Sequence, residues 1–218
     1  ELRTPLAVLR GELDAIEDGV RSFDAAKRES LQTEVARLTK LVGDLHDLSV
    51  YDEGGLSYQN ERLDISGFLA ALLDRAEPRL RDAGIALTRR LPEVPVVVSA
   101  DETRLEQLFA NLIENTIRYT DAPGSLFITC RVESDNIDID FADSAPGVPE
   151  SALDRLFDRL FRVEASRSRH SGGAGLGLSI CKAIVDAHGG SIQALGSEAG
   201  GLLIRITLPL ADASSNST

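Results

Sequence analysis

Apolar residues near the start of the chain recur at alternating spacings of four and three, the pattern of helices that bury one narrow face. They form two runs, Leu2, Leu6, Leu9, Leu13, Ile16 and Val20, followed by Leu31, Val35, Leu38, Val42 and Leu45. A break at Gly19–Phe23 separates the runs, so residues 1–53 are predicted to form an antiparallel helical hairpin. One hairpin leaves most of this stripe exposed. We therefore expect a homodimer through residues 1–50, with two hairpins forming a four-helix bundle; a coiled-coil spacer without chemistry is the alternative.

Beyond residue 60 the pattern changes to short alternating runs between helices. Residues 54–60, which include Gly54 and Gly55, are typical of a linker. Helices are predicted over residues 66–83, 102–119 with Asp101 as N-cap, and up to about 188, and strands over residues 85–91, 94–99, 126–132, 137–141, 191–196 and 202–208. This order predicts an α+β protein in which residues 61–211 form an α/β sandwich, a mixed sheet with helices on one face. Residues 212–218 are expected to be a disordered tail.

Composition narrows the class of protein further. The 218 residues carry a formal charge of −12, with 43% hydrophobic and 27% charged residues, as in an ordinary soluble globular protein. The acidity is spread along the chain, so neither part has the basic surface of a nucleic-acid binder. Phosphate ligands remain compatible with this charge, because main-chain N–H groups can hold them.

The sequence lacks the patterns of membrane-spanning helices, disulfide bonds and zinc sites. No apolar run approaches the roughly 18 residues of a membrane-spanning helix, and the absence of methionine suggests a fragment whose upstream part could contain membrane spans. Cys130 and Cys181 lie in apolar runs without CxxC spacing, so a disulfide is not expected. His46, His170 and His188 form no closely spaced pair, so a zinc site is not expected.

A polar stripe marks the helix predicted after Asp101. Asn111, Asn115 and Arg118 are spaced four and three residues apart, beside an apolar stripe that must face the sheet. Amide oxygens can ligate Mg²⁺ and a guanidinium can bind phosphate. The stripe therefore suggests a site for metal-bound phosphate; a solvated helix face is the alternative.

Two turns add candidate ligand groups. Asp143 follows a strand, so its carboxylate could accept a hydrogen bond from a ligand amine while Gly147 permits close approach. The glycine-rich segment Gly172–Leu178 opens a helix, where free N–H groups and the helix dipole attract an anion. No Lys-Ser/Thr follows it, which excludes a P-loop. An arginine-rich loop before it, with Arg162, Arg167 and Arg169, suggests a lid over phosphates. The alternative for the Asp143 turn and for the glycine-rich segment is a turn with a purely structural role.

Taken in order, these segments resemble the nucleotide-binding boxes of sensor histidine kinases. Asn111–Asn115 with Arg118 and Tyr119 is similar to the N box, Asp143–Gly147 to the G1 box, Leu156–Arg162 to the F box, and Gly173–Leu178 to the G2 box. Glu1–Pro5 resembles the H box directly after its phosphoacceptor histidine. The resemblance covers nearly the whole chain and is especially close to BaeS-type envelope-stress kinases.

The resemblance implies a Bergerat-type (GHKL) fold for the α/β domain, with ATP and Mg²⁺ as ligands. Asp143 would select adenine, with Tyr119 lining the base pocket, and Asn115 with Asn111 would hold Mg²⁺. The groups expected to hold the phosphates are Arg118, Arg162 and the main chain around Gly173, Gly175, Leu176, Gly177 and Leu178.

The resemblance also implies catalytic roles near the start of the chain. Glu1 would increase the nucleophilicity of the preceding histidine, and Thr4 would position water for dephosphorylation of a response regulator. The phosphoryl group would pass to an aspartate of that regulator's receiver domain. The fragment would be the cytoplasmic portion of a bacterial inner-membrane protein, attached only through a missing upstream segment.

Two departures from the family pattern matter. Ser144-Ala145 replaces the usual Asn-Gly of the G1 box, and the acceptor histidine would precede Glu1. As written, the fragment is therefore expected to bind nucleotide without phosphorylating itself at the usual site. The alternatives are a GHKL-fold ATPase and a non-catalytic nucleotide-binding dimerisation scaffold.

Overall fold

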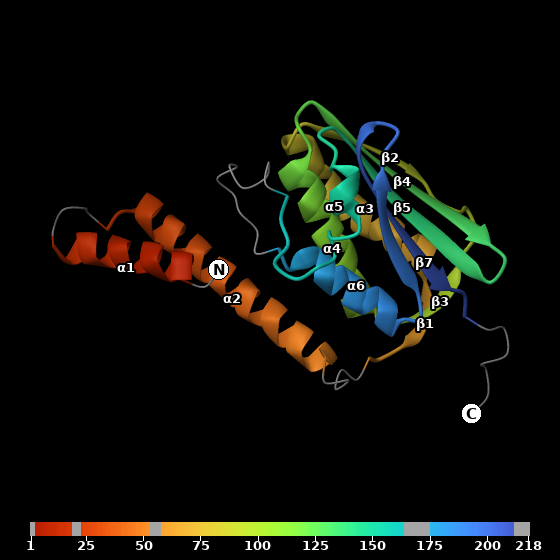
Figure 1. Ribbon diagram of the computed structural model, residues 1–218, viewed down its shortest axis with the longest axis horizontal. Coiled ribbons are helices and arrows are strands. Elements are labelled where there is room, and N and C mark those ends of the chain that lie inside the picture. The colour runs from red at the N-terminus through yellow and green to blue at the C-terminus, as the bar shows by residue number, and fades with distance from the viewer. Residues whose placement is uncertain (1–2, 19–22, 53–57, 164–174, 212–218) are drawn as a thin grey trace. The chain divides into compact units, whose positions relative to one another are not determined.

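The chain divides into two compact units, Glu1–Gly55 and Leu56–Thr218. The computed structural model describes residues 3–18, 23–52, 58–163 and 175–211, and Figure 1 draws the remaining residues as a grey trace. Glu1, the arginine-rich loop at 166–173 and the tail at 212–218 lie outside the described residues.

The first unit consists of the two predicted helices, α1 over Arg3–Glu17 and α2 over Ala25–Asp52. Helix α2 starts after Asp24, whose Oδ1 accepts a hydrogen bond from the Lys27 N–H at 2.8 Å and so satisfies a donor of the first turn. The Lys27 ammonium reaches Glu12 of α1 at 2.5 Å. This ion pair joins the two helices near their connection.

The apolar stripe of the first unit lies in two environments. One set of its residues is half-buried: Leu9, Ile16, Leu31 and Leu38. A second set is exposed: Leu6, Leu13, Val35, Val42 and Leu45, with Leu13 at 55% and Val42 at 56%. An exposed apolar row beside a half-buried one is the surface that another helical pair could cover.

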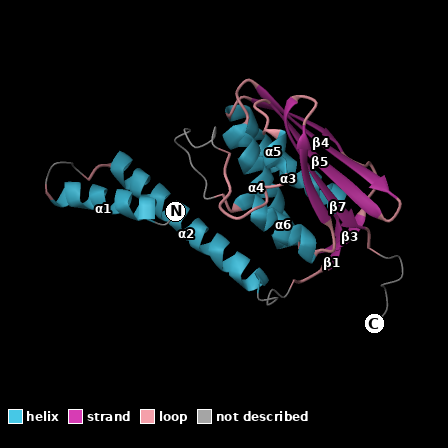
Figure 2. Ribbon diagram, in the orientation of Figure 1, coloured by secondary structure: helices cyan, strands magenta, loops and turns pink. Residues whose placement is uncertain are grey.

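The second unit is built on a five-stranded mixed sheet (Figure 2). Its strands, in spatial order, are β2 (Ile85–Arg90), β4 (Gly124–Glu133), β5 (Asn136–Ser144), β7 (Gly200–Pro209) and β6 (Ser191–Gly196). The β2–β4 pair is parallel and the other pairs are antiparallel. The predicted mixed sheet is therefore confirmed.

Three helices cover one face of this sheet (Figure 1): α3 (Ile65–Asp82), α4 (Glu102–Tyr119) and α6 (Gly177–Ala187). Alternate residues of β5, among them Ile139 and Phe141, are buried under the helices. The Phe109 ring of α4 stacks on Phe141 with centroids 5.6 Å apart. The apolar stripe predicted for α4 thus forms the centre of the core.

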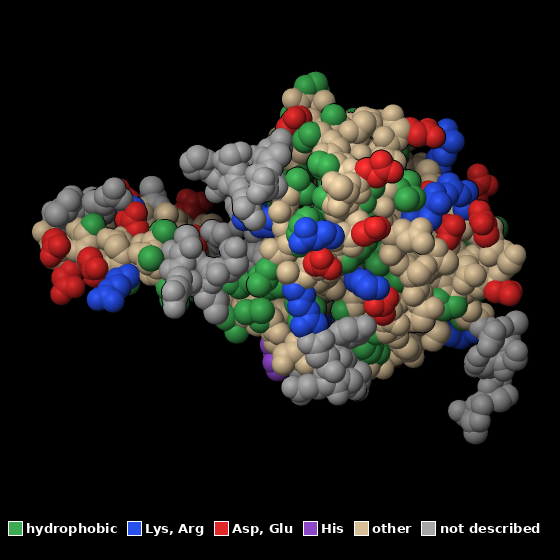
Figure 3. Space-filling model, viewed as in Figure 1, with side chains coloured by type: hydrophobic (Ala, Val, Ile, Leu, Met, Phe, Trp, Pro, Cys, Tyr) green, Lys and Arg blue, Asp and Glu red, His purple; other side chains and the backbone are tan. Residues whose placement is uncertain are grey.

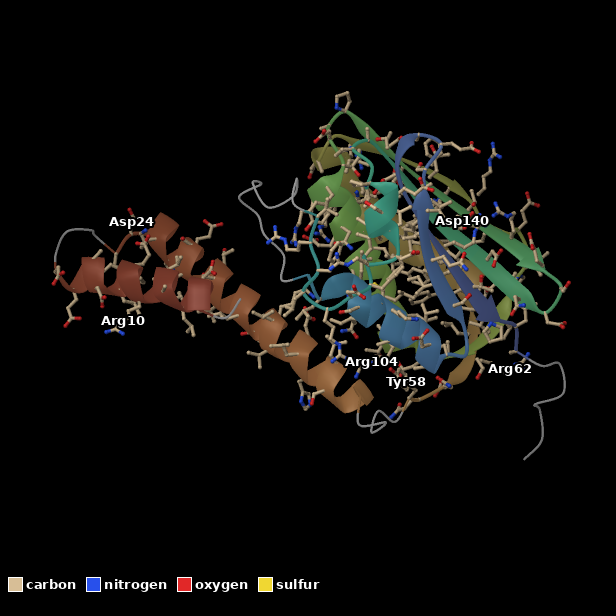
Figure 4. All side chains as sticks on the ribbon, viewed as in Figure 1. Arg10, Asp24, Tyr58, Arg62, Arg104 and Asp140 are labelled. Carbon is tan, nitrogen blue, oxygen red and sulfur yellow. The ribbon has the colours of Figure 1, made fainter. Side chains whose placement is uncertain are left out.

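The other face of the sheet carries a charged cluster centred on Asp140, which is labelled in Figure 4. Arg205 binds both carboxylate oxygens at 2.8 and 2.9 Å, and Arg131 binds Oδ2 at 2.8 Å. Burial opposes ionisation of Asp140, but the hydrogen bonds from the two guanidinium groups outweigh it and lower its pKa. On the face drawn in Figure 3, acidic and basic side chains are likewise intermixed over the second unit.

Hydrogen bonds of His188 link the C-terminal end of α6 to the N-terminus of α4, and these two helices carry the candidate site. Its Nε2 accepts a hydrogen bond from the Asp101 N–H at 3.0 Å, and its Nδ1 donates to the Ile184 carbonyl at 2.7 Å. Asp101 is the N-cap of α4, as predicted, because its Oδ1 accepts from the Arg104 N–H at 3.1 Å. The Tyr58 ring (Figure 4) meets the His188 ring edge-on, with centroids 5.3 Å apart. The start of the second unit is thereby attached to both helices.

Three short elements differ from the sequence-based expectation. Strand β1 (Glu61–Asp64) was not expected; it pairs antiparallel with β3 (Val97–Ala100) in a separate two-stranded sheet. The strand predicted at 94–99 begins later because Pro95 has no N–H to contribute to a ladder. The four-residue helix α5 (Glu150–Leu153) was not expected either.

Candidate functional site

Helix α4 holds the predicted polar stripe at the edge of its buried face. Leu105, Leu108 and Phe109 are fully buried and fix the rotation of the helix. In this orientation Asn111 is 8% exposed, while Asn115 and Arg118, the other two members of the stripe, and the neighbouring Tyr119 are half-buried. The stripe is therefore not a solvated helix face.

The start of α6 lies against this stripe. A Cβ atom at Gly177, the first residue of α6, would stand 3.9 Å from Cγ of Asn111. Leu176, directly before α6, is 1% exposed and belongs to the core. Since the first N–H groups of a helix have no partner within that helix, the N-terminus of α6 brings anion-attracting donors close to an amide side chain.

Gly175, just before this helix, packs against the main chain of the predicted F-box segment. Its φ of +70° is a left-handed conformation that favours glycine, and a Cβ there would lie 2.9 Å from the Phe161 carbonyl oxygen. The Gly175 carbonyl accepts a hydrogen bond from the Leu160 N–H at 3.0 Å. Arg162 follows in this segment and is half-buried, whereas Gly173 lies outside the described residues.

Asp143 stands near the end of β5 in a partly buried position. Burial raises the pKa of its carboxyl group to about 6, although the hydrogen bond from the Leu202 N–H and the nearby Thr120 hydroxyl act in the opposite direction. The Leu202 N–H donates to Oδ1 at 2.6 Å. The carboxylate is therefore held in place and is easily protonated, two properties that are unusual for a surface aspartate.

The turn after Asp143 is tied to the end of α4. The Asp121 N–H, two residues beyond Tyr119, donates to the Ala145 carbonyl at 3.1 Å. Helix α4 consequently borders both the Asp143 turn at its C-terminal end and the N-terminus of α6 along its side. The structure thus brings two of the sequence-predicted segments next to the helix that carries the polar stripe.

Two predicted site residues have contacts in the structure that the sequence did not indicate, and their roles stay predictions. Gly147 was expected to admit a ligand; the structure shows that it also packs closely on β7, because a Cβ there would lie 2.8 Å from the Gly200 carbonyl oxygen. Arg118 was expected to bind phosphate, and here it forms an ion pair with Glu114 at 3.3 Å, which also pairs with Arg79 at 2.7 Å. Arg118 would have to exchange this partner for a phosphate.

Both catalytic candidates lie at the start of the chain. Glu1 lies outside the described residues, and Thr4 lies in α1 with only its main chain described. Within the described ranges, no cluster of three or more His, Cys, Asp or Glu side chains is arranged to hold a metal ion. In the same ranges, no helix has the length and apolar character that crossing a membrane demands.

Two families match the two units. Residues 100–212 match the family described as histidine kinase-, DNA gyrase B-, and HSP90-like ATPase, and residues 1–54 match the His Kinase A (phospho-acceptor) domain. The first match includes the polar stripe of α4, Asp143 and the start of α6. The second covers the helical pair.

Whole-chain comparisons give the same result. The chain is 51% identical over 210 residues to the signal transduction histidine-protein kinase BaeS of Escherichia coli, and the match covers 96% of the chain and 45% of BaeS. It is 35% identical to the sensor histidine kinase WalK of Bacillus subtilis, covering 96% of the chain and 35% of WalK. The chain therefore spans less than half the length of these relatives.

Among solved structures, the Acinetobacter baumannii histidine kinase AdeS matches with a TM-score of 0.82 and 32% identity, covering 97% of this chain and 98% of that one. The catalytic domain of the histidine kinase ThkA matches with a TM-score of 0.62 and 26% identity, covering 69% of this chain and 95% of that one. A phospho-acceptor domain followed by an ATPase domain, both matched by such relatives, shows that the chain belongs to the sensor histidine kinases and is BaeS-like.

Proposed function

We propose that this chain is the kinase core of a two-component sensor that binds ATP in its second unit and phosphorylates a histidine directly before Glu1. The observation that carries this proposal is the grouping of Asp143, the amide stripe and the N-terminus of α6 around α4. The phospho-acceptor match at residues 1–54 favours a kinase over a GHKL-fold ATPase or a scaffold that only binds nucleotide.

Adenine recognition is assigned to Asp143. An ionised carboxylate is a strong acceptor for the exocyclic amine of adenine, whereas guanine presents a carbonyl oxygen at that position. Partial burial strengthens this discrimination, because a polar group left unpaired in a desolvated site costs free energy. Tyr119, at the end of α4 beside the Asp143 turn, would contact the base.

Phosphate binding is assigned to α4 and α6. The donor set at Asn111 and Asn115 fits Mg²⁺, a hard cation that accepts amide oxygens together with phosphate oxygens and water. Mg²⁺ would neutralise charge on the β- and γ-phosphates during transfer. The N–H groups from Gly175 to Leu178 would hold the phosphate chain, and Arg118 and Arg162 would add positive charge near it.

In the proposed reaction, a ring nitrogen of the acceptor histidine attacks the γ-phosphorus while the bond to the β-phosphate oxygen breaks and ADP leaves. Glu1 would accept a hydrogen bond from the other ring nitrogen and so increase the nucleophilicity of the attacking one. The phosphoryl group would then pass to the aspartate of a response-regulator receiver domain. Thr4, one helical turn along, would position the water that later dephosphorylates the regulator.

This division of labour predicts separate effects for two substitutions in a chain that carries the acceptor histidine and its upstream helix. Glu1→Gln should slow autophosphorylation by about 10²–10⁴-fold, the usual contribution of general acid–base assistance. Thr4→Ala should leave that step largely intact and slow loss of phosphate from the regulator. Transfer of radiolabel from ATP, followed by its decay on the regulator, measures both steps. The opposite pattern would show that the two roles are wrongly assigned.

The homodimer and the membrane attachment expected from the sequence remain predictions. The exposed apolar row of the first unit, including Leu13 and Val42, supports a dimer in which two helical pairs form a four-helix bundle.

A further inference from the structure

Strand β7 contains an irregularity directly opposite Asp143. Ala142 pairs with Leu203, but the next pair along the two strands is Ser144 with Gly200. Two residues of β7, Gly201 and Leu202, therefore stand opposite the single residue Asp143. This is the arrangement of a β-bulge, a feature that commonly redirects a side chain beside an active site.

The two residues of the bulge contact the Asp143 carboxylate closely. The Leu202 N–H, freed from regular pairing with β5, donates to Oδ1 of Asp143 at 2.6 Å. Gly201 has no room for a side chain, because a Cβ there would overlap both the carbonyl oxygen and Oδ1 of Asp143. One oxygen of the carboxylate is thus bound by main chain, and this contact limits rotation of the carboxylate about its Cβ–Cγ bond.

The turn that follows Asp143 packs against the same bulge. A Cβ at Gly147 would lie 2.8 Å from the Gly200 carbonyl oxygen and 3.2 Å from that of Gly201. Gly200 itself has a φ of +84°, in the left-handed region. The main chain of β7 at Gly200 and Gly201 therefore packs, without intervening side chains, against Asp143 and against the turn that follows it.

We propose that Gly201 and the Leu202 amide are positioning residues that hold the Asp143 carboxylate so that its second oxygen meets an amino group of the nucleotide base. This inference rests on the proposed adenine recognition by Asp143 and adds the groups that make it selective. A carboxylate free to rotate could offer either oxygen to several donors, whereas a fixed one favours a base with an amine at one position.

The bulge also affects the charge of the carboxylate. A hydrogen bond donated to the ionised form favours that form, in opposition to burial. Displacing the Leu202 N–H should therefore raise the pKa of Asp143 further above its value of about 6. Because only the ionised form accepts a hydrogen bond with both oxygens, nucleotide affinity should fall as the pH drops through this pKa.

A matched pair of variants tests the proposal. Gly201→Ala should force the bulge away from Asp143, weaken ADP binding by roughly tenfold or more, and move the midpoint of its pH dependence upward by about half a unit or more. Gly196→Ala, on the neighbouring strand and paired with Leu202, adds its Cβ to open space and should change neither quantity. Calorimetric titration of ADP between about pH 5 and pH 8 measures both, and circular dichroism reports whether the variants fold.

A measurement on the unaltered chain does not depend on the folding of Gly201→Ala. The Leu202 amide proton should shift with pH at a midpoint near the Asp143 pKa of about 6, and Asp143→Asn should abolish that shift. If ADP binding depends on Asp143 but Gly201→Ala retains the affinity and the midpoint, the positioning role is wrong while the proposed function stands. If ADP binding is independent of Asp143, the adenine assignment itself fails. A Leu202 amide that does not titrate would overturn the inference in either case.

Discussion

Replacing Asp143 with alanine should weaken ADP binding by about 10–100-fold and remove the preference for adenine over guanine nucleotides. The expected size follows from a hydrogen bond between a charged acceptor and the ligand, which contributes about 1.5–3 kcal/mol. Fluorescence competition with ADP and GDP at neutral pH would measure both quantities. Asp135→Ala, an exposed aspartate in the turn between β4 and β5, is the matched control and should bind both nucleotides as the unaltered chain does.

A second property separates a functional role for Asp143 from a structural one. Its pKa is raised mainly by burial, so the ionised carboxylate is unfavourable to the folded unit without ligand at neutral pH. Asp143→Asn, which keeps the size of the side chain and an acceptor for the Leu202 N–H, should therefore unfold at the same or a higher temperature while binding ADP poorly. An Asp143→Ala variant with unchanged affinity and selectivity would remove this residue from the base pocket.

Placing aspartate at both Leu13 and Val42 should convert a dimer of the helical unit into monomers. Both side chains are more than half exposed in the single chain, so the change disrupts a surface between copies and not the packing within one hairpin. A dimer interface would bury four unpaired carboxylates, which is strongly unfavourable. Light scattering over a range of protein concentrations would measure the mass.

Two further sets of substitutions serve as controls for the Leu13 and Val42 variant. Gln32→Asp adds charge at an exposed polar position of α2 outside the apolar stripe and should leave the dimer intact. Leu9 and Leu38 are half-buried within the single chain, so aspartate there should also lower the helix content. If the Leu13 and Val42 variant stays dimeric, the interface lies elsewhere in the chain.

The sequence predicted well those elements whose signals are local and periodic. Helix α4 begins after Asp101 because the carboxylate caps it, and its buried face follows from the spacing of Leu105, Leu108 and Phe109. The strands β4 to β7 alternate between the helix-covered face and the face that carries Asp140. Such patterns depend on neighbours within a few residues, which is why they could be recognised without a structure.

What the sequence did not predict depends on residues far apart in the chain. Strand β1 is four residues long, has no clear alternation, and is fixed by pairing with β3 more than 30 residues away. The bulge at Gly201 and Leu202 acts on Asp143 from a strand 59 residues along the chain. The pair Gly200-Gly201 is visible in the sequence, but two adjacent glycines between predicted strands indicate only a turn. The packing of Gly147 against β7 could not be seen from the sequence either, because Gly200 lies far along the chain.

The measurement that tests the kinase assignment most directly is the location of the phosphate after incubation with ATP. The chain would carry a histidine before Glu1 and the helix that precedes it, and the label would be on the γ-phosphate. We expect label that is stable in base and labile in acid, that maps to this histidine, and that is strongly reduced in the Asp143→Ala variant at limiting ATP. Release of inorganic phosphate from ATP without labelled protein, or label on a different residue, would contradict it.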